Sequence, residues 1–105
     1  EKVDGSVVVG SRGERFAWNC ERFEDLGPAH FEKLVDLGAE LIIFGSGSRI
    51  RFPKPQWLTG LMARRTGVET MDTGAACRTY NILAAEGRHV VAALVVEPQP
   101  GDTGT

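Results

Sequence analysis

Strand-like and helix-like segments alternate from residue 40 onward, and this alternation limits the folds that the chain can adopt. The segments at 40–45 (ELIIFG), 67–71 (GVETM) and 89–97 (HVVAALVVE) are rich in apolar and β-branched residues and predict strands. The segments at about 55–65 and 73–87 place apolar residues at helical spacing. Strands joined by helices need crossover connections, so we expect a largely parallel sheet with helices packed on it, centred on the first strand.

The segments before residue 40 indicate a different arrangement. SVVV at 6–9 and RFAWNC at 15–20 flank the turn-rich GSRGE and predict an antiparallel hairpin. Alternation places three side chains of this hairpin on one face: Phe16, Trp18 and Cys20. A short amphipathic helix then begins at Pro28, which suits the first position of a helix, and stops at Gly38.

The size and composition of the chain indicate one domain. Its 105 residues lie in the usual range for a compact domain, and 42% hydrophobic with 25% charged residues is ordinary for a globular protein. No run reaches the ~18 apolar residues of a membrane span, so we expect a protein that is not embedded in a membrane. We predict a single α/β domain over residues 1–97, with a mixed, mostly parallel sheet and an N-terminal antiparallel hairpin, followed by a disordered tail at 98–105.

Charge and cysteine content argue against several classes of function. Twelve basic and fourteen acidic side chains give a net charge of -2, which offers no positive field to a nucleic acid. Cys20 and Cys77 form no CxxC pair and lie away from His30 and His89, so a zinc site is not expected. We expect reduced thiols, no metal and no cofactor, and, since no export signal is visible, a cytoplasmic location.

The tripeptide Asp-Thr-Gly at 72–74 is the motif by which retroviral-type aspartic proteases place their catalytic carboxylate. Too little sequence follows Asp72 for the flap, second loop and dimer strand of such a protease. The next residues also have helical periodicity, where the protease requires more β-structure. The sequence therefore favours a helix start, in which Asp72 or Thr73 accepts hydrogen bonds from the first exposed backbone N–H groups.

The helix that follows presents three further polar or reactive side chains. Cys77 and Asn81, one turn apart, lie along the edge of the apolar arc, while Arg78 projects away from it. The helix N-terminus could activate the thiol of Cys77 mildly, but a reactive thiol needs a base or a second cysteine nearby. Neither is indicated, so we expect Cys77 to be buried and inert.

A second loop with glycines, GSGSRIRFP at 45–53, directly follows the first buried strand. Gly45 and Gly47 can expose backbone N–H groups to an anion, and Arg49 and Arg51 would add positive charge. The loop is neither a Walker loop nor GxGxxG, because no Lys-Ser/Thr follows and the next segment is extended by prolines where those motifs require a helix. It is a weak indication of nucleotide binding.

Both loops follow strands of the same alternating unit. If those strands are parallel, their carboxyl ends lie at one edge of the sheet, where ligands normally bind. We therefore expect Arg49, Arg51, Asp72 and Thr73 to share this edge with the N-terminus of the last helix. Two interpretations stay open, a binding site and an Arg–Asp ion pair that clamps the two loops.

The motifs GSGSRIRFP, GVETMDTGAACRTYNILAAEGR and VAAL resemble a small domain family of bacteria, archaea and eukaryotes. Its eukaryotic relatives include a mitochondrial assembly factor for respiratory complex I. The resemblance covers about residues 5–96 and implies three layers: a hairpin-bearing β layer plus helix, a central mixed sheet and a helical layer. The motif positions that it carries over are Gly45, Gly47, Arg51, Phe52, Pro53, Asp72, Thr73, Ala76, Cys77, Tyr80 and Asn81.

The resemblance implies no established enzymatic activity, and for the complex I relatives it implies binding of partner subunits during assembly. Ser46 and Ile50 stand where relatives often have threonine and a polar residue, and Gly74 stands where eukaryotic forms tend to carry proline, which indicates a bacterial member. A eukaryotic source would imply a mitochondrial location. Our leading hypothesis is a non-enzymatic binding module, an assembly factor for a membrane or respiratory complex, with a protein partner.

Two other hypotheses stay open. One is a small-anion- or metabolite-binding protein or enzyme that uses the Gly45–Arg51 loop and the helix start at Asp72 and Thr73. The other gives both motifs a purely structural role. The sequence predicts no catalytic residue and leaves the oligomeric state open. The predicted ligand- or partner-binding residues are Gly45, Gly47, Arg49, Arg51, Asp72, Thr73, Cys77, Arg78 and Asn81.

Overall fold

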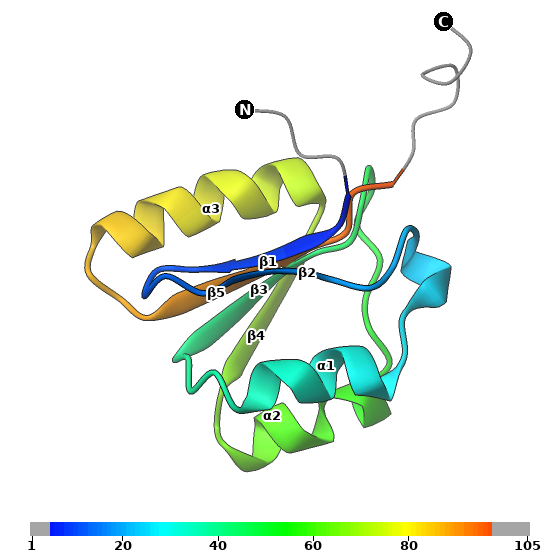
Figure 1. Ribbon diagram of the computed structural model, residues 1–105, viewed down its shortest axis with the longest axis horizontal. Coiled ribbons are helices and arrows are strands. Elements are labelled where there is room, and N and C mark those ends of the chain that lie inside the picture. The colour runs from blue at the N-terminus through cyan, green and yellow to red at the C-terminus, as the bar shows by residue number, and fades with distance from the viewer. Residues whose placement is uncertain (1–4, 98–105) are drawn as a thin grey trace, which may run out of the picture.

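Five strands form one mixed sheet in the order β2-β1-β5-β3-β4 in the computed structural model, which describes residues 5–97 (Figure 1). The strands are β1 Val7–Gly10, β2 Arg15–Ala17, β3 Leu41–Gly45, β4 Gly67–Met71 and β5 Val90–Leu94. The helices are α1 Pro28–Val35, α2 Thr59–Ala63 and α3 Thr73–Ala85, with short 3-10 turns η1 Phe23–Asp25 and η2 Pro55–Leu58. The tail predicted at 98–105 lies outside the described residues.

The pairing of the strands confirms a mixed α/β sheet and refines its topology. β3 pairs in parallel with β4 and with β5, while β1 pairs antiparallel with β2 and with β5. The parallel character is therefore confined to the part built after residue 40. The hairpin extends this same sheet, because β1 adds to the free edge of β5 and forms no layer of its own.

The centre of the sheet is β5, so the expectation that the 40–45 strand occupies it is wrong. All five residues of β5 are buried, and β3 lies between β5 and the edge strand β4. Both strands read as continuous apolar runs because helices cover both of their faces. The apolar pattern therefore identifies the two covered strands, while the addition of the hairpin decides which one is central.

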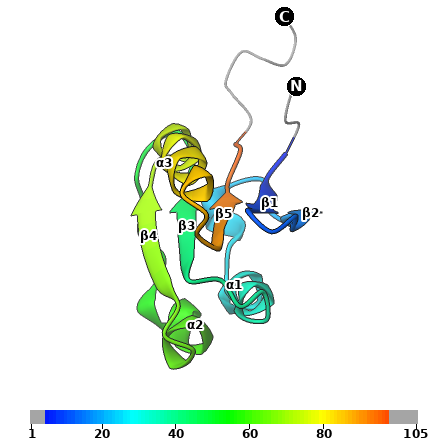
Figure 2. The same ribbon diagram turned by 90° about the vertical axis from the view of Figure 1, so that its left-hand side faces the viewer.

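Three layers result, with α1 and α2 on one face of the sheet and α3 on the other (Figures 1 and 2). Successive strand residues point to opposite faces, so the two faces have separate cores. Ile42 and Phe44 pack on the α1 side, whereas Ile43 packs on the α3 side. Phe16, Trp18 and Cys20 of the N-terminal segment all contact the first of these cores, as their alternation predicts.

The predicted helix at 55–65 is divided into η2 and α2. A single α-helix over this segment would place Trp57, Leu58, Leu61 and Met62 on one apolar stripe, but Leu61 is buried and Met62 is exposed. A 3-10 turn has three residues per turn, where an α-helix has 3.6, so η2 shifts the phase of the positions that follow. The stripe derived for one continuous α-helix consequently breaks at Met62.

Candidate functional site

The carboxyl ends of the three parallel strands meet at one edge of the sheet. β3 ends at Gly45, β4 at Met71 and β5 at Leu94, and each is followed by a segment that bends across this edge. A pocket of about 260 Å³ opens between these segments. Its lining residues are Gly47, Ser48, Asp72, Thr73, Gly74, Val95, Val96 and Glu97.

The hydroxyl group of Thr73 ties the three segments together. Its Oγ1 accepts a hydrogen bond from the Gly47 N–H at 2.9 Å and donates to the Val95 carbonyl at 2.7 Å. The backbone N–H of Thr73 also donates to the Gly47 carbonyl at 2.8 Å. Thr73 therefore lies at the predicted edge, and its hydroxyl is used to hold the β3 loop against the start of α3 and the end of β5.

Close packing explains the two glycines of the first loop. A Cβ atom at Gly45 would lie 3.0 Å from the Cα of Thr73, so its absence lets α3 approach β3. Gly47 has φ +109, and a Cβ there would lie 2.8 Å from Nη2 of Arg51. Both glycines therefore serve close packing. The Gly47 N–H donates to Oγ1 of Thr73, so it is not available to bind an anion.

Asp72 is the N-cap of α3, as the sequence predicts. Its backbone is extended, with φ -66 and ψ 162, and its Oδ1 accepts a hydrogen bond from the Ala75 N–H at 2.9 Å. This bond satisfies one of the N–H groups that a helix start leaves open. α3 runs to Ala85 in helical geometry, so the aspartic protease interpretation has no structural basis.

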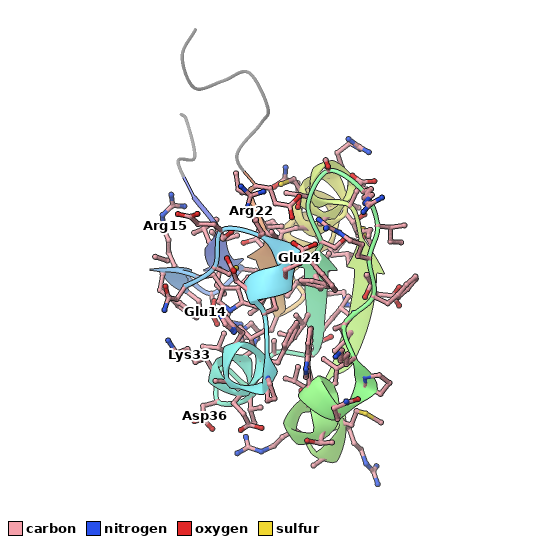
Figure 3. The ribbon with its side chains drawn as sticks, turned by 90° about the vertical axis from the view of Figure 1, so that its right-hand side faces the viewer. Glu14, Arg15, Arg22, Glu24, Lys33 and Asp36 are labelled. Carbon is pink, nitrogen blue, oxygen red and sulfur yellow. The ribbon has the colours of Figure 1, made fainter. Side chains whose placement is uncertain are left out.

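Arg51 is turned inward and forms ion pairs with glutamates. Its Nη2 lies 2.7 Å from Oε2 of Glu97 and donates to the Ser46 carbonyl at 2.9 Å. Its Nη1 lies 3.3 Å from Oε2 of Glu24, which is on η1 (Figure 3). The guanidinium also lies 5.0 Å from the ring centroid of Phe23. Within residues 5–97 no salt bridge joins Asp72 to Arg49 or Arg51, so the Arg–Asp clamp, one of the two interpretations left open, is not formed.

Glu97 connects this cluster to the N-terminal half of the chain. Its Oε2 accepts a hydrogen bond from the Phe23 N–H at 3.0 Å in addition to the contact with Arg51. Burial alone would raise the pKa of Glu97, but the Phe23 N–H and the guanidinium outweigh it and hold the pKa below its ordinary value. Glu97 is therefore an ionised anchor that fixes both η1 and the loop after β3.

Ser46 holds the loop in shape from within. Its fully buried hydroxyl donates to the Arg49 carbonyl at 2.7 Å and accepts from the Arg51 N–H at 2.8 Å. The sequence analysis missed Ser46 and Glu97 as site residues. A small hydroxyl residue between two glycines is a recognisable signal for such local bonds, whereas nothing in the sequence pairs Glu97 with Arg51.

Six of the nine predicted site residues do not line the pocket, and two of them, Gly45 and Arg51, are buried or partly buried. Arg49, Cys77, Arg78 and Asn81 are exposed and do not line it. The expectation of a buried Cys77 is wrong, because Ala76 takes the inward position in the first turn of α3. Desolvation of the thiol raises the pKa of Cys77, and the nearby charge of Arg78 offsets this only in part.

Two exposed apolar side chains lie beside the pocket-forming loop. Ile50 is 51% exposed and Phe52 is 69% exposed, whereas Arg51 and Pro53 are turned inward. Both side chains therefore add apolar surface to the loop next to the pocket. The resemblance included Phe52 as a motif position, but the sequence gave no sign that it faces solvent.

The pocket is lined by two carboxylates and two hydroxyl groups. Among residues 5–97, no hydrogen bond joins the carboxylates of Asp72 and Glu97 to the hydroxyls of Ser48 and Thr73. Across residues 5–97, no group of three or more His, Cys, Asp or Glu side chains could hold a metal ion. No helix in the same range is long and apolar enough to cross a membrane. What the edge offers is a fixed loop with apolar side chains on its surface.

Comparisons with known proteins agree with this architecture. The family described as "Protein of unknown function (DUF498/DUF598)" matches residues 1–95. A crystal structure of a Bordetella parapertussis protein superposes with a TM-score of 0.82 at 36% identity, covering 89% of this chain and 80% of that one. An NMR structure of a Xanthomonas campestris protein gives 0.77 at 33% identity, covering 89% and 70%.

The sequence is also similar to an assembly factor. NADH dehydrogenase [ubiquinone] 1 alpha subcomplex assembly factor 3 of Homo sapiens is 35% identical over 88 residues, which cover 82% of this chain and 47% of the relative. The chain thus spans about half the length of the curated relatives that it matches.

Proposed function

This chain belongs to the DUF498/DUF598 family, and from that membership we propose that it is a non-enzymatic binding module acting in the assembly of a larger protein complex. Relatives in the family carry the name of a complex I assembly factor, which supports protein partners for this chain as well. The proposal places the partner contact at the edge formed by the loop after β3. This role is proposed for the matched domain, which covers about half the length of those relatives.

One observation carries the proposal: two polar groups of the edge are bound within the chain, while two large apolar side chains of the same loop are exposed. The hydroxyl of Thr73 and the guanidinium of Arg51 are both bound within the chain. Ile50 and Phe52 are the large apolar side chains left exposed on the same loop. Binding energy at protein interfaces is concentrated in such anchors, aromatic residues above all.

Small-anion binding, the main alternative, receives less support from the geometry. The pocket beside the α3 N-terminus is lined by Asp72 and Glu97, whose negative charge repels an anion. The guanidinium that would attract an anion is already paired with Glu97 and Glu24. A thermal-shift screen with phosphorylated and carboxylated metabolites tests this alternative, and a rise in Tm that Arg51→Ala abolishes would favour it.

The proposal is tested by cross-linking capture in cells that express the tagged chain. Wild type should recover the same identified partner in repeated experiments, and Ile50→Ala and Phe52→Ala should reduce the recovery. Ile82→Ala is a matched control, because Ile82 is 61% exposed but lies on α3, across the sheet from α1 and α2. Equal recovery by all three variants would refute the binding role of this edge.

A further inference from the structure

The segment after Ser46 forms a ridge with a regular alternation of side chains. Four exposed residues, Arg49, Ile50, Phe52 and Lys54, make up what we call the ridge. Between them, Arg51 and Pro53 are turned toward the protein. From Ile50 to Lys54 exposed and inward residues alternate, so Ile50, Phe52 and Lys54 are the members of this segment that reach solvent.

The ridge has a rigid base. The Arg51 side chain is bonded to Glu97, Glu24 and the Ser46 carbonyl, and its backbone N–H donates to the Ser46 hydroxyl. At the far end, the Lys54 carbonyl accepts a hydrogen bond from the Trp57 N–H at 2.9 Å. A partner that binds a surface held in this way does not have to order the backbone, which removes one cost of association.

The charge of the ridge is one-sided. The sequence from Gly45 to Val68 contains five basic residues and no Asp or Glu, although the whole chain has a net charge of -2. The charge of Arg51 is matched by its two glutamates. Arg49 and Lys54 are exposed beside Ile50 and Phe52, and the Lys54 ammonium lies 5.9 Å from the ring centroid of Trp57. A complementary surface therefore carries carboxylates next to apolar side chains.

We propose that the ridge binds a segment of a protein partner that combines Asp or Glu with apolar side chains. This inference rests on the proposed binding role and adds the chemistry of the partner. An anionic lipid surface would offer similar charges, but a membrane interface favours a broad apolar face such as that of an amphipathic helix, which the ridge lacks. The apolar contribution of the ridge is also limited to two side chains, which suits a short peptide segment.

Selection from a random peptide library displayed on phage tests the proposal directly. Enriched peptides should contain acidic residues together with aromatic or aliphatic ones, and their affinity should fall with rising salt. Phe52→Ala should weaken binding of such a peptide about 30-fold, the scale of a central interface residue. The double variant Arg49→Glu/Lys54→Glu should weaken it about tenfold or more, and Ile82→Ala should leave it unchanged.

Three results would overturn the proposal: no enrichment, enrichment of basic or uncharged peptides, or peptide binding that the Arg49→Glu/Lys54→Glu variant retains. Cosedimentation with phosphatidylglycerol vesicles that depends on Phe52, without peptide binding, would assign the ridge to a membrane surface instead. The result also separates the two proposals. If cellular capture depends on Phe52 but survives the charge reversal, the binding module stands and the acidic partner is refuted.

Discussion

Replacing Arg51 by methionine tests whether the ion-pair cluster holds the edge together. The change keeps an unbranched apolar side chain and removes the bonds to Glu97, to Glu24 and to the Ser46 carbonyl. A charged hydrogen bond contributes about 1.5–3 kcal/mol, and the cation–π contact with Phe23 about 0.5–1 kcal/mol. The Nε of Arg51 is buried and finds no partner among the described residues, which reduces the net gain.

These contributions predict that Arg51→Met lowers the free energy of unfolding by about 3 kcal/mol, a fall in Tm of roughly 10–25 °C. Urea unfolding followed by tryptophan fluorescence measures it, since Trp18 is buried in the core. A double-mutant cycle with Glu97→Gln should give a coupling of about 2 kcal/mol. The control cycle with Glu24→Gln should give at most about 1 kcal/mol, because Glu24 is 69% exposed.

The same variant has a defined pH dependence. The folded-state pKa of Glu97 is lowered, so its stabilising contribution is complete above the unfolded-state pKa and is lost as pH falls through the folded-state pKa. The penalty of Arg51→Met should therefore shrink in acid, in the range below about pH 4.5. A coupling between Arg51 and Glu97 under about 0.5 kcal/mol, or one that is independent of pH, would refute the reasoning.

Substitutions at Gly47 and Thr73 and a titration of the two cysteines test the packing of the edge and the exposure of the thiols. Gly47→Ala should destabilise the protein by about 2–4 kcal/mol in thermal and urea unfolding, because φ is positive and the new Cβ meets Arg51. The control Gly5→Ala, where a Cβ has open space, should change stability by less than about 0.5 kcal/mol. Thr73→Val should cost about 2 kcal/mol by leaving the Gly47 N–H without its acceptor, and Thr73→Ser should restore most of it. In thiol-reagent titrations the exposed Cys77 should react before the half-buried Cys20. The pH at which Cys77 reaches half-maximal reactivity should lie above that of a free cysteine, because the pKa of Cys77 is raised. Reaction of Cys20 first would contradict the assigned exposure.

Local features of the fold could be predicted from neighbouring residues. The β4 strand over Gly67–Met71, the start of α1 at Pro28 and the cap at Asp72 all follow from periodicity and helix-start chemistry. Each depends on interactions within a few residues, which a linear sequence displays directly. The sequence also predicted that the loop at 45–53 and the helix start at Asp72 meet at one edge of the sheet. This prediction required only that the two preceding strands be parallel.

Other features needed the tertiary arrangement. The predicted Arg–Asp clamp was replaced by a Thr73 clamp and an Arg51–Glu97 pair, because Glu97 reaches the edge only through the central position of β5. Cys77 is exposed because α3 turns Ala76 toward the sheet. Helical periodicity in the sequence does not decide which of these two adjacent residues faces inward.

The sequence by itself determined the class of fold, the order of strands and helices along the chain, and the family. Tertiary structure decided which charges pair, which strand is central and which apolar side chains stay in solvent. The physical reason is distance along the chain: capping and periodicity act within a few residues, whereas Arg51 and Glu97 are brought together only by the completed sheet. The exposure of Ile50 and Phe52 is a consequence of the same pairing, because the inward turn of Arg51 sets the direction of its neighbours.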